Sequence, residues 1–389
     1  MILIKNADVY SPEHLGIKDI LIAGESIIKI HDEIDVSSLK DLLGIEIIDA
    51  NQKRVIPGLI DAHVHIAGAG GEGGPATRTP EMQISQMFTG GITSVVGCLG
   101  TDGMTRSLNS VLMKVKSLRE EGVSAWMYTG SYQVPPPTIL GDVGKDIAMI
   151  NEIIGVGEIA ISDHRSSCPS TDELIRLTEH ARVGGMLGGK AGIVNIHMGD
   201  AQNPFQPIYE AISKSELKFT QFFPTHCNRN EYIFEDSKKY GKKGYIDITA
   251  SSYPYYPDYE IKPSKAIVEL LNAGVPLEHI TMTSDGNGSL PDFDENGNLV
   301  KLEMGQPKSI YDELVDTIID ERLPLEKALK VVTSNVADIL KLNNKGRLVN
   351  GKDADLVILD HNFKIYSLIA QGKIVVSDYQ LIKKGTYEV

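Results

Sequence analysis

Apolar residues in the middle of the chain occur in short runs that alternate with longer amphipathic segments. Eight runs have the length and composition of buried strands, and they cover residues 58–65, 93–100, 124–132, 157–163, 191–200, 219–228, 245–251 and 279–285. Helical patterns separate most of them, and one of these begins with Ser170 and Glu173 at the spacing of a capping box. Eight strands with crossovers are the count of a TIM-type (β/α)8 barrel, so we predict an α/β fold of that kind.

The two ends of the chain resemble each other and differ from the middle. Short strand-like runs separated by turn residues fill residues 1–57, and the same style returns after Leu342 in GRLVNGKDADLVILD and FKIYSLIAQGKIVVSD. We therefore predict a small β-sandwich domain formed by both termini, residues 1–55 and 345–389. The barrel would occupy residues 56–344.

Composition and charge exclude several classes of partner. A net charge of −14 over 389 residues argues against nucleic acid and anionic membranes, which attract basic surfaces. The first residues, MILIKNADVYSPE, lack the features of a signal peptide, and no apolar run reaches the ~18 residues that span a bilayer. Three scattered cysteines fit a reducing compartment. We expect a cytoplasmic protein with no nucleic-acid or membrane partner.

Residues that can bind metals stand at the carboxyl ends of the predicted strands, where a barrel builds its active site. His63 and His65 are two positions apart, so both face the same side of a strand and can chelate one ion. His197, His226 and Asp285 each end a further strand. Imidazole and carboxylate ligands suit zinc or a similar divalent cation.

Glu158 raises a separate question, because it places a carboxylate at the start of the buried run Ile159–Ile161. One interpretation is a strand-edge acid that reaches solvent. The other is an anionic bridge between two metal ions. Two dications carry four positive charges, and Glu158, Asp285 and a hydroxide carry three negative ones, so a cluster of this kind is nearly balanced.

Three nearby residues have plainer interpretations. Cys227 follows His226 and points the opposite way on strand parity, so we predict that it packs in the core. Lys190 precedes a strand, which argues against its carrying a carboxylate group to a metal site. His164 adjoins the candidate site, and its role stays open.

Longer strings carry a family resemblance. HVHIAGAGGEGGPATRTPE, GVGEIAISDHRSS, IVNIHMGD, PTHCNRN and TSDGNGSLP resemble the isoaspartyl (β-aspartyl) dipeptidase family of the amidohydrolase superfamily, and the similarity runs essentially end to end. The resemblance implies cleavage of the isopeptide bond in β-Asp-Xaa dipeptides by a binuclear zinc centre. It also implies a homo-oligomer, an octamer by family analogy.

The resemblance extends to single positions. It implies that His63, His65 and Asp285 hold one metal and that His197 and His226 hold the other. Glu72 matches the residue that pairs with the α-amino group of the substrate, and the remaining substrate contacts match Thr101, Tyr132, Arg165, Arg229 and Ser289. At the position of Glu158, well-known members of the family carry a carboxylated lysine.

The chemistry of the substrate agrees with these residues. A β-Asp dipeptide presents one ammonium and two carboxylates, which Glu72, Arg165 and Arg229 would complement. Asp285 would take a proton from the attacking hydroxide and deliver it to the leaving amine, and Tyr132 would help to stabilise the oxyanion. Two alternatives remain: a cyclic-amide hydrolase of the hydantoinase or dihydroorotase type, and a non-catalytic binding protein.

Overall fold

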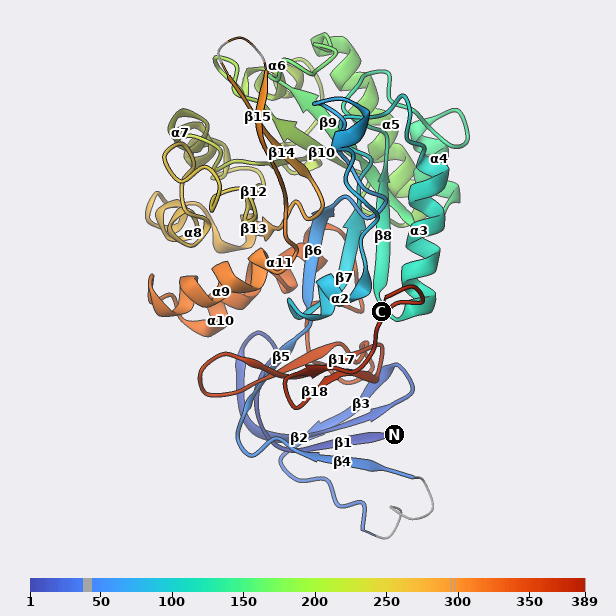
Figure 1. Ribbon diagram of the computed structural model, residues 1–389, viewed down its shortest axis with the longest axis vertical. Coiled ribbons are helices and arrows are strands. Elements are labelled where there is room, and N and C mark those ends of the chain that lie inside the picture. Colours follow the sequence, from blue (N-terminus) through green and yellow to red (C-terminus); the bar gives the residue numbers. More distant parts are fainter. Residues whose placement is uncertain (38–43, 295, 297, 389) are drawn as a thin grey trace.

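A computed structural model describes residues 1–37, 44–294, 296 and 298–388 (Figure 1). Six of the predicted runs form one parallel sheet in the order β11-β10-β9-β8-β7-β6, and the other two form the parallel pair β12-β13. Their bounds are β6 (Leu59–Val64), β7 (Ile92–Gly97), β8 (Ser124–Thr129), β9 (Ile153–Ile161), β10 (Ile193–Met198), β11 (Phe222–Thr225), β12 (Ile246–Thr249) and β13 (Ile280–Thr283). Nearly every residue of these strands is buried, which is why each reads as a continuous apolar run.

Contacts also join the pair β12-β13 to both edges of the larger sheet. The Cys227 amide, after β11, donates to the Asp247 carbonyl at 3.2 Å. On the other side, Val64 of β6 and Gly286 form an isolated parallel bridge. The fold is therefore mixed α/β with a curled parallel sheet, as the alternating pattern predicts.

Helices connect the strands and cover the outside of this sheet (Figure 1). They are α2 (Ile84–Phe88), α3 (Leu108–Glu121), α4 (Val143–Met149), α5 (Thr171–Gly188), α6 (Gln206–Ser213), α7 (Glu231–Tyr240), α8 (Pro263–Asn272), α9 (Ser309–Ile319), α10 (Leu325–Lys330) and α11 (Ser334–Ile339). The capping box before α5 is confirmed, because the Glu173 carboxylate accepts the Ser170 amide at 2.9 Å and the Ser170 hydroxyl accepts the Glu173 amide. Among the described helices, none is both long and apolar enough to cross a membrane.

The main core lies between the parallel sheet and these helices. In α3, Val111, Val115 and Leu118 are fully buried, and their spacing of three and four residues puts them on one face. Burying such a side chain contributes about 1.5–3 kcal/mol. The helices therefore hold the strands in place while the strand ends stay free to carry polar side chains.

Both ends of the chain contribute to a second sheet, which the described residues build from nine strands. Its order is β19-β18-β17-β16-β5-β1-β2-β3, with β4 paired to β1. The strands are β1 (Ile2–Tyr10), β2 (His14–Ala23), β3 (Ser26–His31), β4 (Glu46–Asp49), β5 (Arg54–Pro57), β16 (Leu356–Leu359), β17 (Ile365–Ala370), β18 (Lys373–Ser377) and β19 (Gln380–Leu381). The terminal segments thus share one sheet, whereas its arrangement as a sandwich and the domain boundaries stay predictions.

A hairpin that the sequence pattern did not predict follows β13. It consists of β14 (Ser289–Phe293) and β15 (Leu299–Met304), which pair antiparallel. It extends past the end of the parallel sheet (Figure 1). Ser289 and its neighbours therefore lie near the strand ends where the candidate chemistry gathers.

Candidate metal centre and substrate cavity

Glu158 lies at the centre of the predicted cluster. Because β9 begins at Ile153, Glu158 lies inside this strand rather than at its start, and the residue is 1% exposed. Four imidazoles surround its carboxylate: Oε2 lies 3.3 Å from His63 Nε2, 3.0 Å from His197 Nδ1 and 3.6 Å from His226 Nε2, and Oε1 lies 3.5 Å from His65 Nε2. The interpretation of Glu158 as a solvent-exposed strand-edge acid is therefore wrong.

Asp285 reaches the same cluster from the segment after β13. Its Oδ1 lies 3.1 Å from His65 Nε2 and 3.7 Å from His63 Nε2. The backbone fixes this approach, because the Asp285 amide donates to the His63 carbonyl at 3.1 Å. All six residues that the sequence proposed as metal ligands are thus brought together.

Three of the histidines are held by oxygen atoms on the side away from Glu158. His63 Nδ1 lies 3.1 Å from Asn195 Oδ1, and His226 Nδ1 lies 2.7 Å from Thr249 Oγ1. In His197 the nitrogen held in this way is Nε2, which lies 3.1 Å from Asp163 Oδ2. Such partners fix the ring orientation and direct the opposite nitrogen toward Glu158.

Glycines let the backbone around Glu158 pack closely. A Cβ at Gly157 would lie 2.7 Å from Asn195 Cβ, and one at Gly155 would lie 2.5 Å from the Ile193 carbonyl. The space that these two glycines leave is taken up by Ile193 and Asn195 of β10. Glu158 is therefore positioned by the close fit of two neighbouring strands.

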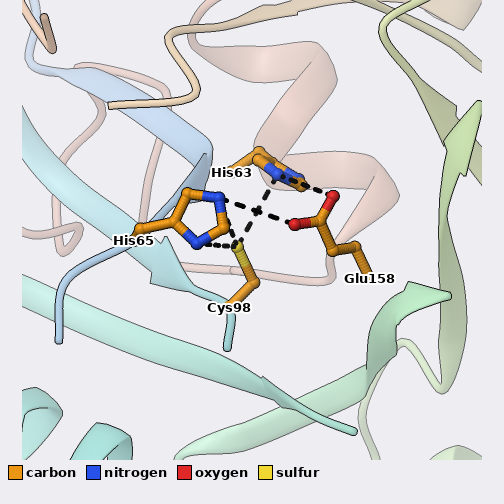
Figure 2. A group of neighbouring side chains, drawn as sticks. All are labelled: His63, His65, Cys98 and Glu158. Carbon is orange, nitrogen blue, oxygen red and sulfur yellow. Dashed lines mark hydrogen bonds and ion pairs between the residues drawn. The ribbon is translucent and has the colours of Figure 1, made fainter. Parts of the chain in front are cut away.

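Two groups of side chains can each hold one cation. One is His63, His65, Cys98 and Glu158 (Figure 2), and the other is Glu158, His197 and His226; within each group the ligand atoms lie within 4.8 Å of one another. Glu158 Oε1 is buried and accepts no hydrogen bond from any residue that the structure describes. A buried carboxylate oxygen that lies among imidazoles and accepts no hydrogen bond fits a divalent cation, so the residues present suit a metal.

The electrostatics of the cluster point the same way. Burial would raise the pKa of Glu158, but His63, His197 and His226 hold it well below its usual range. Burial and the neighbouring His197 lower the pKa of His226 to about 3, which keeps its imidazole neutral. Burial would also lower the pKa of His65, yet Cys98 and Asp285 raise it. Without a metal, a proton on His65 thus compensates the negative charge of the neighbouring carboxylates, and the same negative charge would attract a metal cation.

A cavity of about 710 Å³ opens beside this cluster. Its lining includes His226 and Asp285 together with five of the predicted substrate contacts, which are Glu72, Thr101, Arg165, Arg229 and Ser289. His164 also lines the cavity and is mostly exposed. The cavity therefore connects the candidate metal ligands to charged groups that a small zwitterionic substrate would need.

The two arginines do not face the cavity as independent cations. Arg165 forms a bidentate pair with Asp163, through Nε to Oδ1 at 3.0 Å and Nη2 to Oδ2 at 2.9 Å. Arg229 Nη1 lies 3.7 Å from Asp163 Oδ2 and donates to the Met198 carbonyl at 3.2 Å. Asp163 is itself buried, and although burial would raise the pKa of its carboxyl, His197 and Arg165 hold it far below the usual range.

Glu72 and Tyr132 also have defined partners. Glu72 Oε2 accepts the Ser289 hydroxyl at 2.8 Å, and Glu72 Oε1 lies 3.6 Å from Arg165 Nη1. The Tyr132 hydroxyl lies 2.8 Å from His197 Nδ1, and its ring faces the Arg165 guanidinium at 5.2 Å. Tyr132 is thus oriented toward the cluster, with its phenol beside a candidate metal ligand.

Two residues of this site were missed by the sequence analysis. Asp163 stands two positions before Arg165 in SDHRS, and this proximity was the available signal for its role as a pairing carboxylate. Cys98 was counted only among the scattered cysteines, although it follows β7 directly and so stands at a strand end like the histidines.

The expectations for Cys227 and Lys190 agree with their contacts, since Cys227 Sγ donates to the Pro224 carbonyl and Lys190 Nζ donates to the Ile147 carbonyl.

Comparisons with known proteins agree with this site. The model of the amidohydrolase family matches residues 257–369. An allantoinase from Enterococcus faecalis is 24% identical and the match covers 93% of this chain and 87% of the relative. A dihydroorotase from Acetivibrio thermocellus is 29% identical, with 92% and 89% covered.

A solved structure gives a stronger match. The β-aspartyl dipeptidase of Fervidobacterium islandicum AW-1, in complex with β-Asp-Leu, is 43% identical to this chain over 98% of both chains, with a TM-score of 0.90. Identity at this level over the full length carries family membership as well as the fold. The chain therefore belongs to the β-aspartyl dipeptidase family of the amidohydrolase superfamily, a superfamily of hydrolases.

Proposed function

We propose that the protein hydrolyses the β-aspartyl isopeptide bond of β-Asp-Xaa dipeptides with the help of two divalent metal ions, most simply zinc. The observation that carries this proposal is the cavity in which Glu72, Arg165 and Arg229 stand beside His226 and Asp285. Glu72 would complement the single ammonium of such a dipeptide, and the two guanidinium groups, which share the Asp163 carboxylate, would donate to its two carboxylates. The 43% identical relative was solved with β-Asp-Leu, which supports the same substrate class.

The metal ligands follow from the two groups that share Glu158. His63, His65 and Asp285 would hold one ion, His197 and His226 the other, and Glu158 would contact both. Bound divalent ions supply an activated water near neutral pH and a polarised carbonyl. Neutral nitrogen donors and carboxylates suit zinc.

The protein side chains would position the substrate and move its protons. Asp285 lines the cavity and reaches the histidine cluster, so it is placed to accept a proton from the attacking water and to donate it to the leaving amine. Tyr132 would donate its hydroxyl to the developing oxyanion. Glu72, with one oxygen already fixed by Ser289, would bind the free α-ammonium, and the two arginines would bind carboxylates.

Linkage specificity follows from this arrangement. An α-linked dipeptide carries its ammonium next to the scissile carbonyl, one methylene away from the position that Glu72 would recognise. Leaving half-buried charged groups without their partners costs about 1–3 kcal/mol for each, so we expect kcat/KM to favour the β-linkage by at least about 100-fold. Similar kcat/KM values for β-Asp-Leu and α-Asp-Leu would contradict the proposed specificity.

The alternative of cyclic-amide hydrolysis draws support from the dihydroorotase and allantoinase matches. A carboxylate aimed at a free amine has no partner in allantoin, which argues for the dipeptide. The decisive experiment incubates the metal-loaded protein with β-Asp-Leu, α-Asp-Leu, dihydroorotate and allantoin. Hydrolysis of β-Asp-Leu alone supports the proposal, turnover of a cyclic amide replaces it, and no turnover favours the non-catalytic alternative.

We also propose three features of the architecture. The contacts at both edges of the parallel sheet support closure into an eight-stranded barrel over residues 56–344. Residues 1–55 and 345–389 would form the separate β-domain, arranged as a sandwich. The family resemblance further suggests a homo-oligomer, an octamer by analogy, which light scattering of the purified protein would test.

A further inference from the structure

Cys98 lies among the donors of the first metal group. Its Sγ is 3.6 Å from His63 Nε2, 3.6 Å from His65 Nδ1 and 3.9 Å from His65 Nε2, and the residue is fully buried. Figure 2 shows the sulfur directed at the space between both imidazoles and the Glu158 carboxylate. The resemblance to the family assigned no role to this position.

The separations match the edges of a coordination polyhedron. Zinc binds nitrogen and oxygen at about 2.0–2.2 Å and sulfur at about 2.3 Å, so neighbouring donors on one ion lie about 3–4 Å apart. The nitrogen–oxygen distances from His63 and His65 to Glu158 are 3.3 and 3.5 Å. The sulfur–nitrogen distances of 3.6 and 3.9 Å fall in the same range.

A second observation independently points to a ligand at this place. Glu158 belongs to the same group, and its Oε1 is buried and has no hydrogen-bond partner among the described residues. Besides the two imidazoles, Cys98 Sγ contacts one carbonyl, Val64 O, at 3.6 Å. By contrast, Cys227 Sγ lies 3.4 Å from Pro224 O and belongs to neither metal group.

Charge balance gives a third argument. Two dications carry four positive charges, and Glu158, Asp285 and a hydroxide supply three negative ones. A Cys98 thiolate would supply the fourth and make the buried cluster neutral. Since an uncompensated charge is costly to bury, a thiolate at this position stabilises the loaded site.

We propose that Cys98 is a metal ligand, binding as a thiolate to the ion that His63 and His65 hold. The thiol loses its proton to solvent as the metal binds. A thiolate selects thiophilic divalent ions such as zinc, cobalt and cadmium over magnesium and manganese. This inference rests on the metal centre of the proposed function and specifies its chemistry.

The first test uses the wild-type protein and needs no substitution. X-ray absorption fine structure at the zinc edge of the zinc-loaded protein should contain a sulfur shell at about 2.3 Å. A spectrum that requires only nitrogen and oxygen at about 2.0–2.2 Å would overturn the proposal.

The second test locates the sulfur. Cobalt added to metal-free wild-type protein should produce a thiolate-to-metal charge-transfer band in the near ultraviolet. The band should disappear in Cys98→Ser and persist in Cys227→Ser and Cys168→Ser, which alter one buried and one exposed thiol outside the metal groups. Persistence of the band in Cys98→Ser would refute the assignment.

Metal content and hydrolysis separate the two proposals. If the wild-type protein binds metal and cleaves β-Asp-Leu but shows no sulfur ligand, only the role of Cys98 is refuted. If the protein binds no metal and leaves β-Asp-Leu intact, the proposed function fails first. In Cys98→Ser, the ratio of zinc affinity to manganese affinity should fall by about 10-fold or more, as measured by competition between the two metals.

Discussion

The contacts of Asp163 make a sharp prediction, because this carboxylate links the candidate metal centre to the substrate arginines. Its Oδ2 lies 3.1 Å from His197 Nε2 and 2.9 Å from Arg165 Nη2, while Oδ1 accepts the Arg165 backbone amide at 2.7 Å and Nε at 3.0 Å. In Asp163→Asn, one oxygen can keep the contacts of Oδ1. The side-chain NH2 group of the new asparagine then replaces Oδ2 and faces the N–H donors of His197 and Arg165, which lose their acceptor.

The size of the effect follows from exposure. The His197 side chain is 2% exposed, so water cannot replace its lost acceptor, and a hydrogen bond to a charged group contributes about 1.5–3 kcal/mol. This energy corresponds to about 10- to 100-fold in metal affinity. The Arg165 side chain is 22% exposed, so solvent recovers part of its loss, which should appear as a higher KM.

The assay is competition for zinc between the protein and a chromophoric chelator, with KM for β-Asp-Leu measured in parallel. Asp338→Asn is the matched control, because it removes another bidentate carboxylate–arginine pair, to Arg347 at 2.7 Å, on the surface. Such exposed pairs contribute about 0–1 kcal/mol, so the control should bind zinc like wild type. Unchanged zinc affinity in Asp163→Asn would show that Asp163 does not orient His197.

Three further predictions concern acidic side chains. Glu72→Gln should lose most activity while retaining its metals, measured by metal analysis, because its proposed partner is substrate; loss of metal would mean that Glu72 is structural. Metal-free protein reconstituted with zinc in carbon-dioxide-free buffer should bind two metals per chain with or without added bicarbonate, since Glu158 needs no carboxylation. Bicarbonate-dependent metal loading would contradict the proposed role of Glu158. The variant Glu158→Ala should lose at least one metal. Burial raises the pKa of Glu260 to about 7, against the opposing effects of Ser252 and Arg229. The pKa of this carboxyl is higher in the folded protein than in the unfolded chain, so its contribution to stability is fully present below about pH 4.5. As pH rises from about 4.5 through about 7, the free energy of unfolding should fall by up to about 3 kcal/mol. Denaturant unfolding of the metal-free protein at several pH values should show this fall in the free energy of unfolding for wild type and a smaller fall for Glu260→Gln. An equal pH dependence in both proteins would refute the assignment.

Periodicity predicted the strands of the parallel sheet because all of them are buried on both faces. Apolar runs such as IVNI and LIDA follow directly from that burial. The hairpin of β14 and β15 escaped this reasoning, since its strands have no continuous apolar run to mark them. Closure of the sheet also escaped it, because strand count alone does not determine which edges meet.

The candidate site was predictable where position along a strand determines direction. His63 and His65 share a face because they are two positions apart on a strand, and both contact Glu158. Pairing between side chains was not predictable in the same way. The sequence treated Arg165 and Arg229 as free cations, whereas both approach Asp163, whose buried carboxylate needs positively charged partners.

Glu158 shows how a local departure from a family pattern can be accommodated. A glutamate is much shorter than a carboxylated lysine, so a bridge at this position requires either a closer strand or closer partners. Gly155 and Gly157 let β9 pack tightly on β10, and the carboxylate then lies within 3.6 Å of all four imidazoles. Cys98 Sγ lies 3.6 Å from His63 Nε2, the nitrogen that also faces Glu158, and a thiolate there would add a further negative charge. Because Glu158 and Cys98 belong to the same group of possible ligands, we expect the carboxylate and the proposed thiolate to act as one ligand set.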